Sequence, residues 1–365
     1  MVWLGRSNTE FFRFVSLTMK ALVLSEYRHL TIADLPIPEP GPYELLIRVA
    51  ACGICGSDVH GYDGSSGRRI PPIVMGHEAA GVVERAGQGV TAFKKGDRVT
   101  FDSTISCGEC DPCRRGEMNL CDRRQVLGVS CGDYRRNGAF AEFLVVPAHI
   151  TYRLPDNLPF AEAAMLEAVA VALHAVSLAP ITRDSTALIL GAGTIGLLVQ
   201  QALRVAGCSH VFVADIDETR LQLSSKLGAS SVLQSGPSLS NEIAKLTGGA
   251  GVDVAIEAVG INPTVAAAID NVRKGGKVVL VGNIAPEATI NLQKVVTRQI
   301  RLQGSCASAG EYPRAMELMS AGRMNVKPLI TAIAALADGP RWFERLYRRE
   351  PNLMKVVLAP GAMAQ

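Results

Sequence analysis

The sequence predicts an α/β protein of two domains, in which a β-rich domain precedes a doubly wound parallel sheet. Its 365 residues are too many for one small core and suit two apolar cores. Short apolar runs separated by Gly and Pro continue to about residue 155, and from about residue 185 apolar strands alternate with helical stretches. This change of pattern predicts βαβ units in the second part.

The elements of the two parts are predicted from particular runs. In the first part, the expected strands of a barrel-like domain include LLIRVAA, AAGVVERAG and AEFLVVP. In the second, the expected strands and helices alternate as TALIL, TIGLLVQQALRVAG, HVFVAD, ETRLQLSSKLG, VDVAIEAVG, NPTVAAAIDNVRKGG and KVVLVG. After about Cys306 the alternation becomes irregular.

Composition and charge favour a folded protein with a small-molecule ligand. Hydrophobic residues make up 48% of the chain and charged residues 19%, which argues against disorder. The net charge is +3, and the basic residues are scattered among acidic ones, so the sequence shows no basic cluster of the kind that binds nucleic acid. No apolar run has the length of a membrane span. We therefore expect neither nucleic acid nor membrane as a partner.

The cysteines and the N-terminal stretch favour a cytoplasmic protein. There are nine cysteines, an odd number, and four lie within fifteen residues at metal-ligand spacing, which favours a reducing compartment over disulfides. Residues 1–18 are apolar but interrupted by charges, and they have no small-residue cleavage site. They are an upstream start or a loose extension before the strand-like run that Met19 opens.

The segment GAGTIG predicts a dinucleotide site, because it follows the strand TALIL directly and opens a helix. Gly191 allows the tight turn, Gly193 lets the backbone approach a pyrophosphate, and Gly196 lets helix and strand pack closely. Thr194 and Ile195 begin the helix, whose free N–H groups attract phosphate. The alternative is that the glycines serve only as turn residues.

Two residues, one at the end of the next strand and one shortly after it, predict which cofactor binds. Asp215 ends the strand HVFVAD, where a carboxylate accepts hydrogen bonds from the adenosine ribose and repels a 2′-phosphate, which favours NAD over NADP. Arg220, five residues later, either flanks the ribose or is solvated.

Four cysteines predict a structural zinc site. Cys107, Cys110 and Cys113 are separated by two residues each, and Cys121 follows after seven, which places four thiolates within reach of one tetrahedral ion. All four positions are then filled by protein, so the site is structural. Four unmetallated thiols or a zinc knuckle for nucleic acid are the alternatives, and the surrounding chain is not basic enough for the second.

A second metal site is predicted from two short motifs. CGICGSDVH contains Cys52, Cys55 and His60, and the motif GHE follows, with His77 seventeen residues after His60. Each residue alone is more often a buried thiol or a core histidine. Together in one β-rich domain they suggest a shared ion.

Taken together, these motifs resemble the zinc-containing medium-chain dehydrogenase/reductase family, which includes alcohol, sorbitol and threonine dehydrogenases, and within it the polyol branch. The resemblance extends from Met19 through GICGSD, GHE, the four-cysteine loop, GAGTIG with its acidic partner, and NVKPLIT. It implies a GroES-like catalytic domain over 19–155, a Rossmann domain over 156–305, and a segment over 306–365 that returns to the catalytic domain. A homodimer or homotetramer is also implied.

The resemblance assigns the ligands of a catalytic zinc. Cys55 and His77 match the first two ligands, while Cys52 falls on a position that binds no metal. Glu167, in AAMLEAVAVALHAV, matches the third ligand, which is a glutamate in sorbitol-type members. Glu78 matches a carboxylate that approaches the zinc when its water exchanges. His174, on the same helical stretch as Glu167, is expected to be structural.

The resemblance also assigns a proton path. Ser57 would accept the substrate proton and relay it through the cofactor ribose to His60. Asp58 would hydrogen-bond the free ring nitrogen of His77 and fix its tautomer, with a turn residue as the alternative role. An open zinc site would lower the pKa of a bound alcohol, so that the hydroxyl loses its proton and the carbinol carbon can then give up hydride.

The expected function is therefore a zinc-dependent oxidoreductase that transfers a hydride from a secondary alcohol (polyol, cyclitol or sugar alcohol) to NAD, giving a ketone. The expected cofactors are NAD and two Zn²⁺ per chain. Alternatives are a threonine- or simple-alcohol-type dehydrogenase of the same family, a non-catalytic NAD-binding protein on this fold, and a lyase or epimerase that uses NAD transiently.

The substrate pocket departs from the sorbitol pattern. Sorbitol dehydrogenases place an Arg-Tyr pair after the strand that here reads IRLQGSC, and this chain has Ala307 and Ser308 there. Small residues cannot make the charged contact of that pair and leave more room, so sorbitol is expected to be a poor substrate. Cys131, Tyr134 and Arg135 are either pocket contacts or part of a surface loop.

Overall fold

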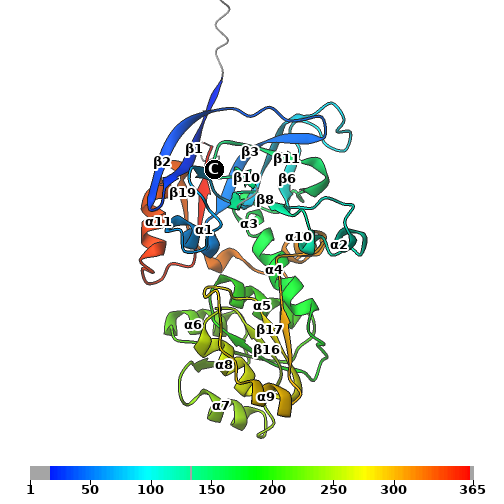
Figure 1. Cartoon of the computed structure of the whole chain (residues 1–365), viewed down its shortest axis with the longest axis vertical. Helices are drawn as coiled ribbons and strands as arrows, with labels where there is room; N and C mark the ends of the chain where they lie inside the picture. Colours follow the sequence, from blue (N-terminus) through cyan, green and yellow to red (C-terminus); the bar gives the residue numbers. More distant parts are fainter. Residues whose placement is uncertain (1–16, 132–133, 362–365) are drawn as a thin grey trace, which may run out of the picture.

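The computed structural model of the chain describes residues 17–131 and 134–361 (Figure 1). A β-rich part lies at one end of the long axis and a part with a parallel sheet at the other. This architecture confirms the predicted fold class. Most of the predicted N-terminal extension, residues 1–16, lies outside the described residues, and the strand expected at Met19 is the start of a strand over Thr18–Glu26.

The β-rich part is built on a mixed sheet with the strand order β12-β6-β5-β3-β20-β19, in which β11 also pairs with β3. A three-stranded sheet, β2-β1-β4, and two antiparallel two-stranded pairs, β9 with β10 and β7 with β8, complete it. The strands are β1 (Thr18–Glu26), β2 (His29–Pro36), β3 (Glu44–Gly53), β4 (Ile73–Val74), β5 (Glu78–Ala86), β6 (Arg98–Phe101), β7 (Thr104–Ile105), β8 (Gln125–Val126), β9 (Val129–Cys131), β10 (Tyr134–Arg136), β11 (Phe143–Pro147), β12 (Thr151–Arg153), β19 (Ile330–Ala335) and β20 (Lys355–Ala359).

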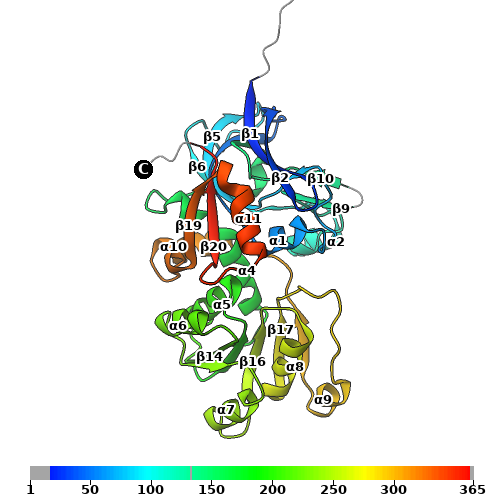
Figure 2. The same cartoon turned by 90° about the vertical axis from the view of Figure 1, so that its left-hand side faces the viewer.

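The last two strands join segments that are far apart in sequence. β20 pairs with the end of β3, with Leu358 opposite Cys52, and β19 pairs with β20. Figure 2 shows these strands and helix α11 (Gly339–Tyr347) packed against the N-terminal strands. Residues from the C-terminal end of the chain therefore complete the core of the β-rich part.

The second part is a six-stranded parallel sheet with the order β15-β14-β13-β16-β17-β18. Its central strands are apolar runs without alternation, and β13 is buried along four of its five residues, as expected when helices cover both faces of a sheet. Its strands are β13 (Thr186–Leu190), β14 (His210–Asp215), β15 (Ser231–Gln234), β16 (Val252–Glu257), β17 (Val272–Leu280) and β18 (Arg301–Gly304).

Helices cover both faces of this sheet, with α4 and α5 in one apolar cluster and α7 and α8 in another. The α-helices in the described part of the chain are α1 (Gly56–Tyr62), α2 (Asp111–Arg114), α3 (Phe160–Ala163), α4 (Leu166–Ser177), α5 (Thr194–Val205), α6 (Glu218–Lys226), α7 (Leu239–Leu246), α8 (Asn262–Asn271), α9 (Leu292–Thr297), α10 (Tyr312–Ser320) and α11. Within residues 17–131 and 134–361, none of the helices has the length and apolarity that crossing a membrane requires.

Candidate functional site

The glycine loop after β13 has the geometry expected of a dinucleotide site. Gly191 has φ +101°, which a residue with a side chain rarely adopts, and the chain turns there. A Cβ on Gly196 would lie 1.8 Å from the Gly191 carbonyl oxygen, so α5 can approach β13 only without that atom. A Cβ on Gly193 would meet open space. Thr194 and Ile195 begin α5 and are partly exposed.

The acidic partner of this loop lies beside it. Asp215 ends β14 and is buried, with Oδ2 accepting from Ala192 N at 2.6 Å and Oδ1 from Asp217 N at 2.9 Å. A carboxylate has about four lone-pair sites, so these two bonds leave acceptor capacity for ribose hydroxyls. Arg220 is partly exposed, and its Nε lies 3.7 Å from Asp217 Oδ2.

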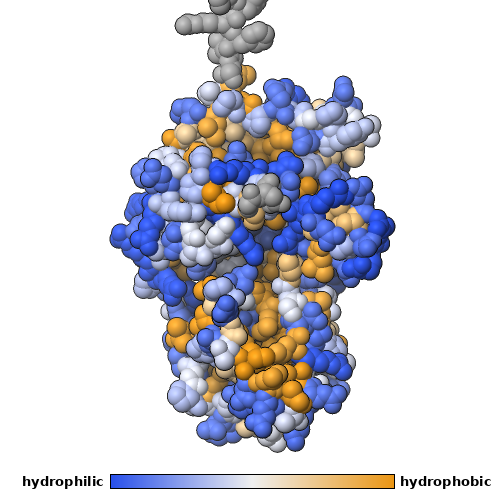
Figure 3. Space-filling model, viewed as in Figure 1, coloured by the Kyte–Doolittle hydropathy of each residue, from blue (hydrophilic) through white to orange (hydrophobic). Residues whose placement is uncertain are grey.

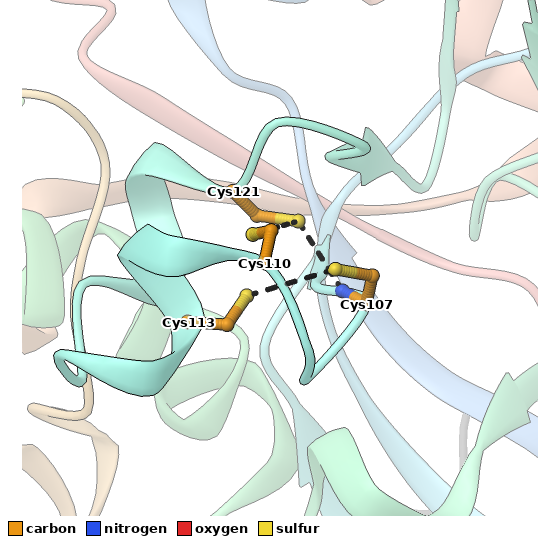
Figure 4. Close-up of side chains that lie close together, drawn as sticks. All are labelled: Cys107, Cys110, Cys113 and Cys121. Carbon is orange, nitrogen blue, oxygen red and sulfur yellow. Dashed lines mark hydrogen bonds between the residues drawn. The ribbon is translucent and has the colours of Figure 1, made fainter.

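The four predicted cysteines form one cluster around α2 (Figure 4). Cys107 Sγ lies 4.0 Å from Cys113 Sγ, and Cys110 Sγ lies 3.8 Å from Cys121 Sγ. Zn–S bonds of about 2.3 Å in a tetrahedron put neighbouring sulfurs roughly 3.8 Å apart. The spacing therefore fits one zinc ion, and all nine cysteines are free thiols rather than disulfides.

The ionisation of these thiols also fits a metal site. Hydrogen bonding, first from the Glu109 backbone, lowers the pKa of Cys107 to about 6. Loss of solvent and then the neighbouring Cys110 thiol raise the pKa of Cys113 to about 12. Like charges this close oppose one another, so four thiolates together need a cation to balance them.

Side chains at the end of this loop bind it to the rest of the protein. Asn119 Nδ2 donates to the Cys306 carbonyl at 2.7 Å and lies 3.3 Å from His174 Nε2. His174 Nδ1 lies 2.8 Å from Glu311 Oε1. The loop, α4 and the segment before α10 are therefore joined through His174, which agrees with a structural role for that residue.

A second cluster brings together Cys55, His77 and Glu78, whose potential ligand atoms all lie within 4.8 Å of one another. Cys55 is the N-cap of α1, where its sulfur accepts from Ser57 N at 3.5 Å. His77 precedes β5 and Glu78 is its first residue, so the two motifs meet because α1 follows β3 and β3 pairs with β5. Cys52 is fully buried, and burial raises its pKa well above the ordinary value.

Asp58 is fully buried beneath this cluster and contacts three groups. Its Oδ2 accepts from Cys55 N at 3.3 Å, and its Oδ1 accepts from Arg69 Nη2 at 3.0 Å and lies 3.3 Å from His77 Nδ1. Burial favours the neutral acid, but His77 and Arg69 outweigh it and hold the pKa of Asp58 well below its usual range. Asp58 therefore remains a carboxylate next to Nδ1, which leaves Nε2 of His77 available to bind an ion.

Glu78 is held by a buried ion pair. Lys355 Nζ, on β20, donates to Glu78 Oε1 at 2.8 Å and Oε2 at 2.6 Å, and to the Ile54 carbonyl at 3.2 Å. A Cβ on Gly53 would lie 2.3 Å from Glu78 Oε2, so this glycine leaves the space that the carboxylate occupies. Glu78 is thus both close to Cys55 and His77 and neutralised by a lysine.

Glu167 lies in the first turn of α4 and is partly buried. It is not among the three residues grouped within 4.8 Å. Burial raises its pKa to about 7, with His77 acting against the rise and Glu78 adding to it. Its charge therefore interacts with the cluster, and its role as the third ligand remains a prediction.

The two predicted relay residues lie on α1. Ser57 is exposed, and its Oγ accepts from Arg69 Nη2 at 3.3 Å. His60 is three residues later, on the same side of the helix, and is partly exposed. The structure thus places the hydroxyl next to the Asp58 and Arg69 pair.

Two basic residues of this region were not identified from the sequence. Lys355 had a usable signal, because a lysine that opens the otherwise apolar strand KVVLA must find a buried partner. Arg69, in the loop GRRIPP, had no such signal in the sequence. Its neighbour Arg68 is also an arginine and is exposed, so the sequence does not show which of the two is buried. Both were found only from their contacts.

The residues expected near the substrate differ in exposure and in their contacts. Ala307 is partly exposed with φ +50°, whereas Ser308 is buried. Cys131 and Tyr134 face each other across β9 and β10, with Sγ 3.9 Å from Oη. Arg135 Nη1 donates to the carbonyls of Pro71 and Pro72 at 3.2 and 3.3 Å, so it fixes that loop.

Comparison with known proteins agrees with these motifs. Residues 41–156 match the family model described as the alcohol dehydrogenase GroES-like domain, and residues 194–321 match the model described as zinc-binding dehydrogenase. The first match includes Cys55, His77 and the four-cysteine loop, and the second begins within the glycine loop.

Individual relatives cover most of the chain. It is 36% identical to L-idonate 5-dehydrogenase from Vitis vinifera, covering 83% of this chain and 84% of the relative. It is 33% identical to sorbitol dehydrogenase from Bacillus subtilis, covering 94% and 98%. A zinc-binding dehydrogenase from Sinorhizobium meliloti, solved bound to NADP, superimposes with a TM-score of 0.85 at 32% identity, covering 94% of this chain and all of the other.

Proposed function

The chain belongs to the zinc-containing medium-chain dehydrogenase family, and we propose that it oxidises a secondary alcohol of a polyol, cyclitol or sugar-derived compound by hydride transfer to NAD. The observation that carries this proposal is the cluster of Cys55, His77 and Glu78, with Ser57 two residues after Cys55 in the first turn of α1. We further propose that residues 19–155 and 306–365 form the catalytic unit and 156–305 the cofactor unit, in a reducing cytoplasm where free thiols persist.

The donor sets suit two zinc ions with different tasks. Cys107, Cys110, Cys113 and Cys121 would hold a closed structural zinc, and Cys55, His77 and Glu167 would hold a catalytic one. When bound, the catalytic zinc supplies Lewis-acid polarisation of the alcohol oxygen, and NAD supplies the hydride acceptor. Glu78, already bound to Lys355, is the carboxylate that would approach the ion during ligand exchange.

The residues of the chain orient the reactants and move the proton. Asp58, whose Oδ1 lies 3.3 Å from His77 Nδ1, would fix the ring of His77, and the glycine loop with Asp215 would position the cofactor. Ser57 Oγ would accept the hydroxyl proton of the substrate, and His60 would receive it at the end of a path through the cofactor ribose. Arg220 would flank that ribose.

A substrate panel tests the proposal. Polyols, sugar alcohols, cyclitols, threonine and simple alcohols are each mixed with NAD, and NADH absorbance is followed. We expect turnover with members of the first three classes. The proposal is wrong if no alcohol is oxidised by zinc-loaded protein, and threonine or a simple alcohol as best substrate would assign another branch of the family.

Within this panel we expect sorbitol to be a poor substrate, at least about tenfold below the best compound in kcat/KM. Ala307 and Ser308 cannot make the hydrogen bonds that an Arg-Tyr pair offers, and each lost polar contact in a desolvated pocket costs on the order of 1–3 kcal/mol. Steady-state kinetics provide the check. Sorbitol as the best compound would contradict this interpretation of the pocket.

NAD should be preferred over NADP by at least about tenfold in kcat/KM, or roughly 1.4 kcal/mol. The Asp215 carboxylate, at the ribose end of the glycine loop, repels a 2′-phosphate. The Sinorhizobium relative bound NADP, so the measurement separates two real possibilities. An Asp215→Asn variant should narrow the ratio, and equal efficiency of the wild type with both cofactors would remove this role from Asp215.

The chain is proposed to form a homodimer or homotetramer. Figure 3 shows apolar surface gathered near α9, and the exposed large hydrophobic residues there are Ile284, Ile290, Leu292 and Val296. Leu292 and Val296 are 64% and 67% exposed, on the segment next to the edge strand β18. Light scattering should give a dimer or tetramer, which Val296→Glu weakens; a monomeric wild type would contradict the proposal.

A further inference from the structure

Arg69 is a buried arginine whose guanidinium touches two residues of the candidate site at once. It is 4% exposed, and it lies in the loop between α1 and β4. Nη2 donates to Asp58 Oδ1 at 3.0 Å and to Ser57 Oγ at 3.3 Å, and Nη1 donates to the Arg68 carbonyl at 3.2 Å. The side chain therefore connects the carboxylate next to His77 with the exposed hydroxyl.

The fold leaves space for this arginine at one glycine of α1. A Cβ on Gly61 would lie 2.1 Å from Arg69 Cγ and 2.9 Å from its Cβ. These atoms are at the base of the side chain, so Arg69 cannot avoid the clash by moving only its guanidinium. A glycine within a helix is unfavourable compared with alanine. At position 61 it is needed because Arg69 crosses the helix where a Cβ would lie.

We propose that Arg69 is a positioning residue for proton transfer, which fixes the orientation of the Ser57 hydroxyl while it holds Asp58 under His77. The inference rests on the proposed dehydrogenase function. A serine hydroxyl has one donor hydrogen and two acceptor lone pairs. Arg69 occupies one lone pair, which leaves the other to accept the proton of the substrate and the O–H to donate it onward.

Arginine is suited to this task because it does not exchange a proton itself. Its guanidinium remains charged and has five N–H donors and no acceptor, so it cannot compete with Ser57 as a base. One nitrogen serves both Asp58 and Ser57, and two further contacts hold the planar group, from Nε to Asp58 Oδ1 at 3.4 Å and from Nη1 to the Arg68 carbonyl at 3.2 Å. A lysine keeps the charge but not this fixed geometry.

The first test compares Arg69→Lys and Arg69→Ala with Arg68→Ala, a matched control in which the neighbouring exposed arginine is removed. For Arg69→Lys we expect kcat to fall at least about tenfold with KM changed less than about threefold, since a positioned general base contributes roughly 10²–10⁴. The kcat should also rise more steeply with pH up to about pH 10, because hydroxide replaces the misaligned hydroxyl. A residue that acts only in folding would not change the pH profile.

A second variant displaces Arg69 without removing it. Gly61→Ala should lower kcat in the wild-type background, because the new Cβ collides with Arg69. In the Arg69→Ala background the 2.1 Å contact with Cγ is gone and only the 2.9 Å approach to Cβ remains, so the same change should lower kcat much less than it does in the wild type. This double-mutant cycle works even if Arg69→Ala alone is less stable.

The outcomes distinguish this inference from the proposed function. If the wild type and Arg68→Ala are active and both Arg69 variants retain kcat and pH profile within about twofold, the inference is wrong and the dehydrogenase proposal stands. Additive effects of Gly61→Ala and Arg69→Ala would also contradict it. If the wild type oxidises no alcohol in the panel, the proposed function fails and the inference fails with it.

Discussion

Replacing Cys107 by serine should lower the melting temperature by roughly 10–15 °C and reduce the zinc content from two ions per chain to one. A structural zinc contributes folding free energy, up to about 10–16 kcal/mol in small metal-dependent domains. For this chain we expect a loss of about 5 kcal/mol in the free energy of unfolding, which corresponds to a fall of roughly 10–15 °C in the melting temperature. The effect should extend beyond the loop, because Asn119 joins it to His174 and the Cys306 carbonyl. Thermal unfolding and metal analysis measure both quantities.

A matched control is Cys131→Ser, which changes a partly buried free thiol outside the cluster. It should keep two zinc ions and shift the melting temperature by less than about 3 °C. Removing both zinc ions from the wild type with a chelator should lower the melting temperature at least as much as Cys107→Ser does. An unchanged melting temperature in Cys107→Ser would show that the four cysteines do not hold a structural ion, and freshly purified wild type with fewer than two zinc ions would contradict the two-site proposal.

Glu167→Gln should reduce kcat by at least about 100-fold while changing the melting temperature by only a few degrees. The amide keeps the size of the carboxylate but removes its charge, and a catalytic zinc with a weaker third ligand is lost or misplaced. Because Glu167 lies in the first turn of α4, the rest of the helix is untouched. Turnover with the best panel substrate and zinc content provide the check.

The same measurement on Glu78→Gln decides which carboxylate is the ligand. Glu78 is within 4.8 Å of Cys55 and His77 but is bound at both oxygens by Lys355. If Glu167 is the third ligand, Glu167→Gln loses the catalytic zinc and Glu78→Gln retains it. The reverse result would assign the ligand to Glu78. Glu162→Gln, on the neighbouring helix α3, is a control expected to retain both activity and metal.

What the sequence determined by itself is local in the chain. The glycine loop could be predicted because a strand, a turn and the start of a helix must follow one another within a few residues. As expected, Gly191 has a positive φ and Gly196 has no room for a Cβ. The four-cysteine cluster is readable because its ligands lie within fifteen residues. In both cases the chemistry depends on spacing along the backbone, and short segments have few ways to satisfy it.

Only the tertiary structure decided which distant charges surround the candidate site. Lys355 and Glu78 are 277 residues apart and meet because β20 pairs with β3, which pairs with β5. Arg69 reaches Asp58 and Ser57 because Gly61 leaves room for it across α1. A buried charged side chain must have a partner, but the sequence around it does not identify that partner. The pairing depends on how the strands and loops pack in the folded chain.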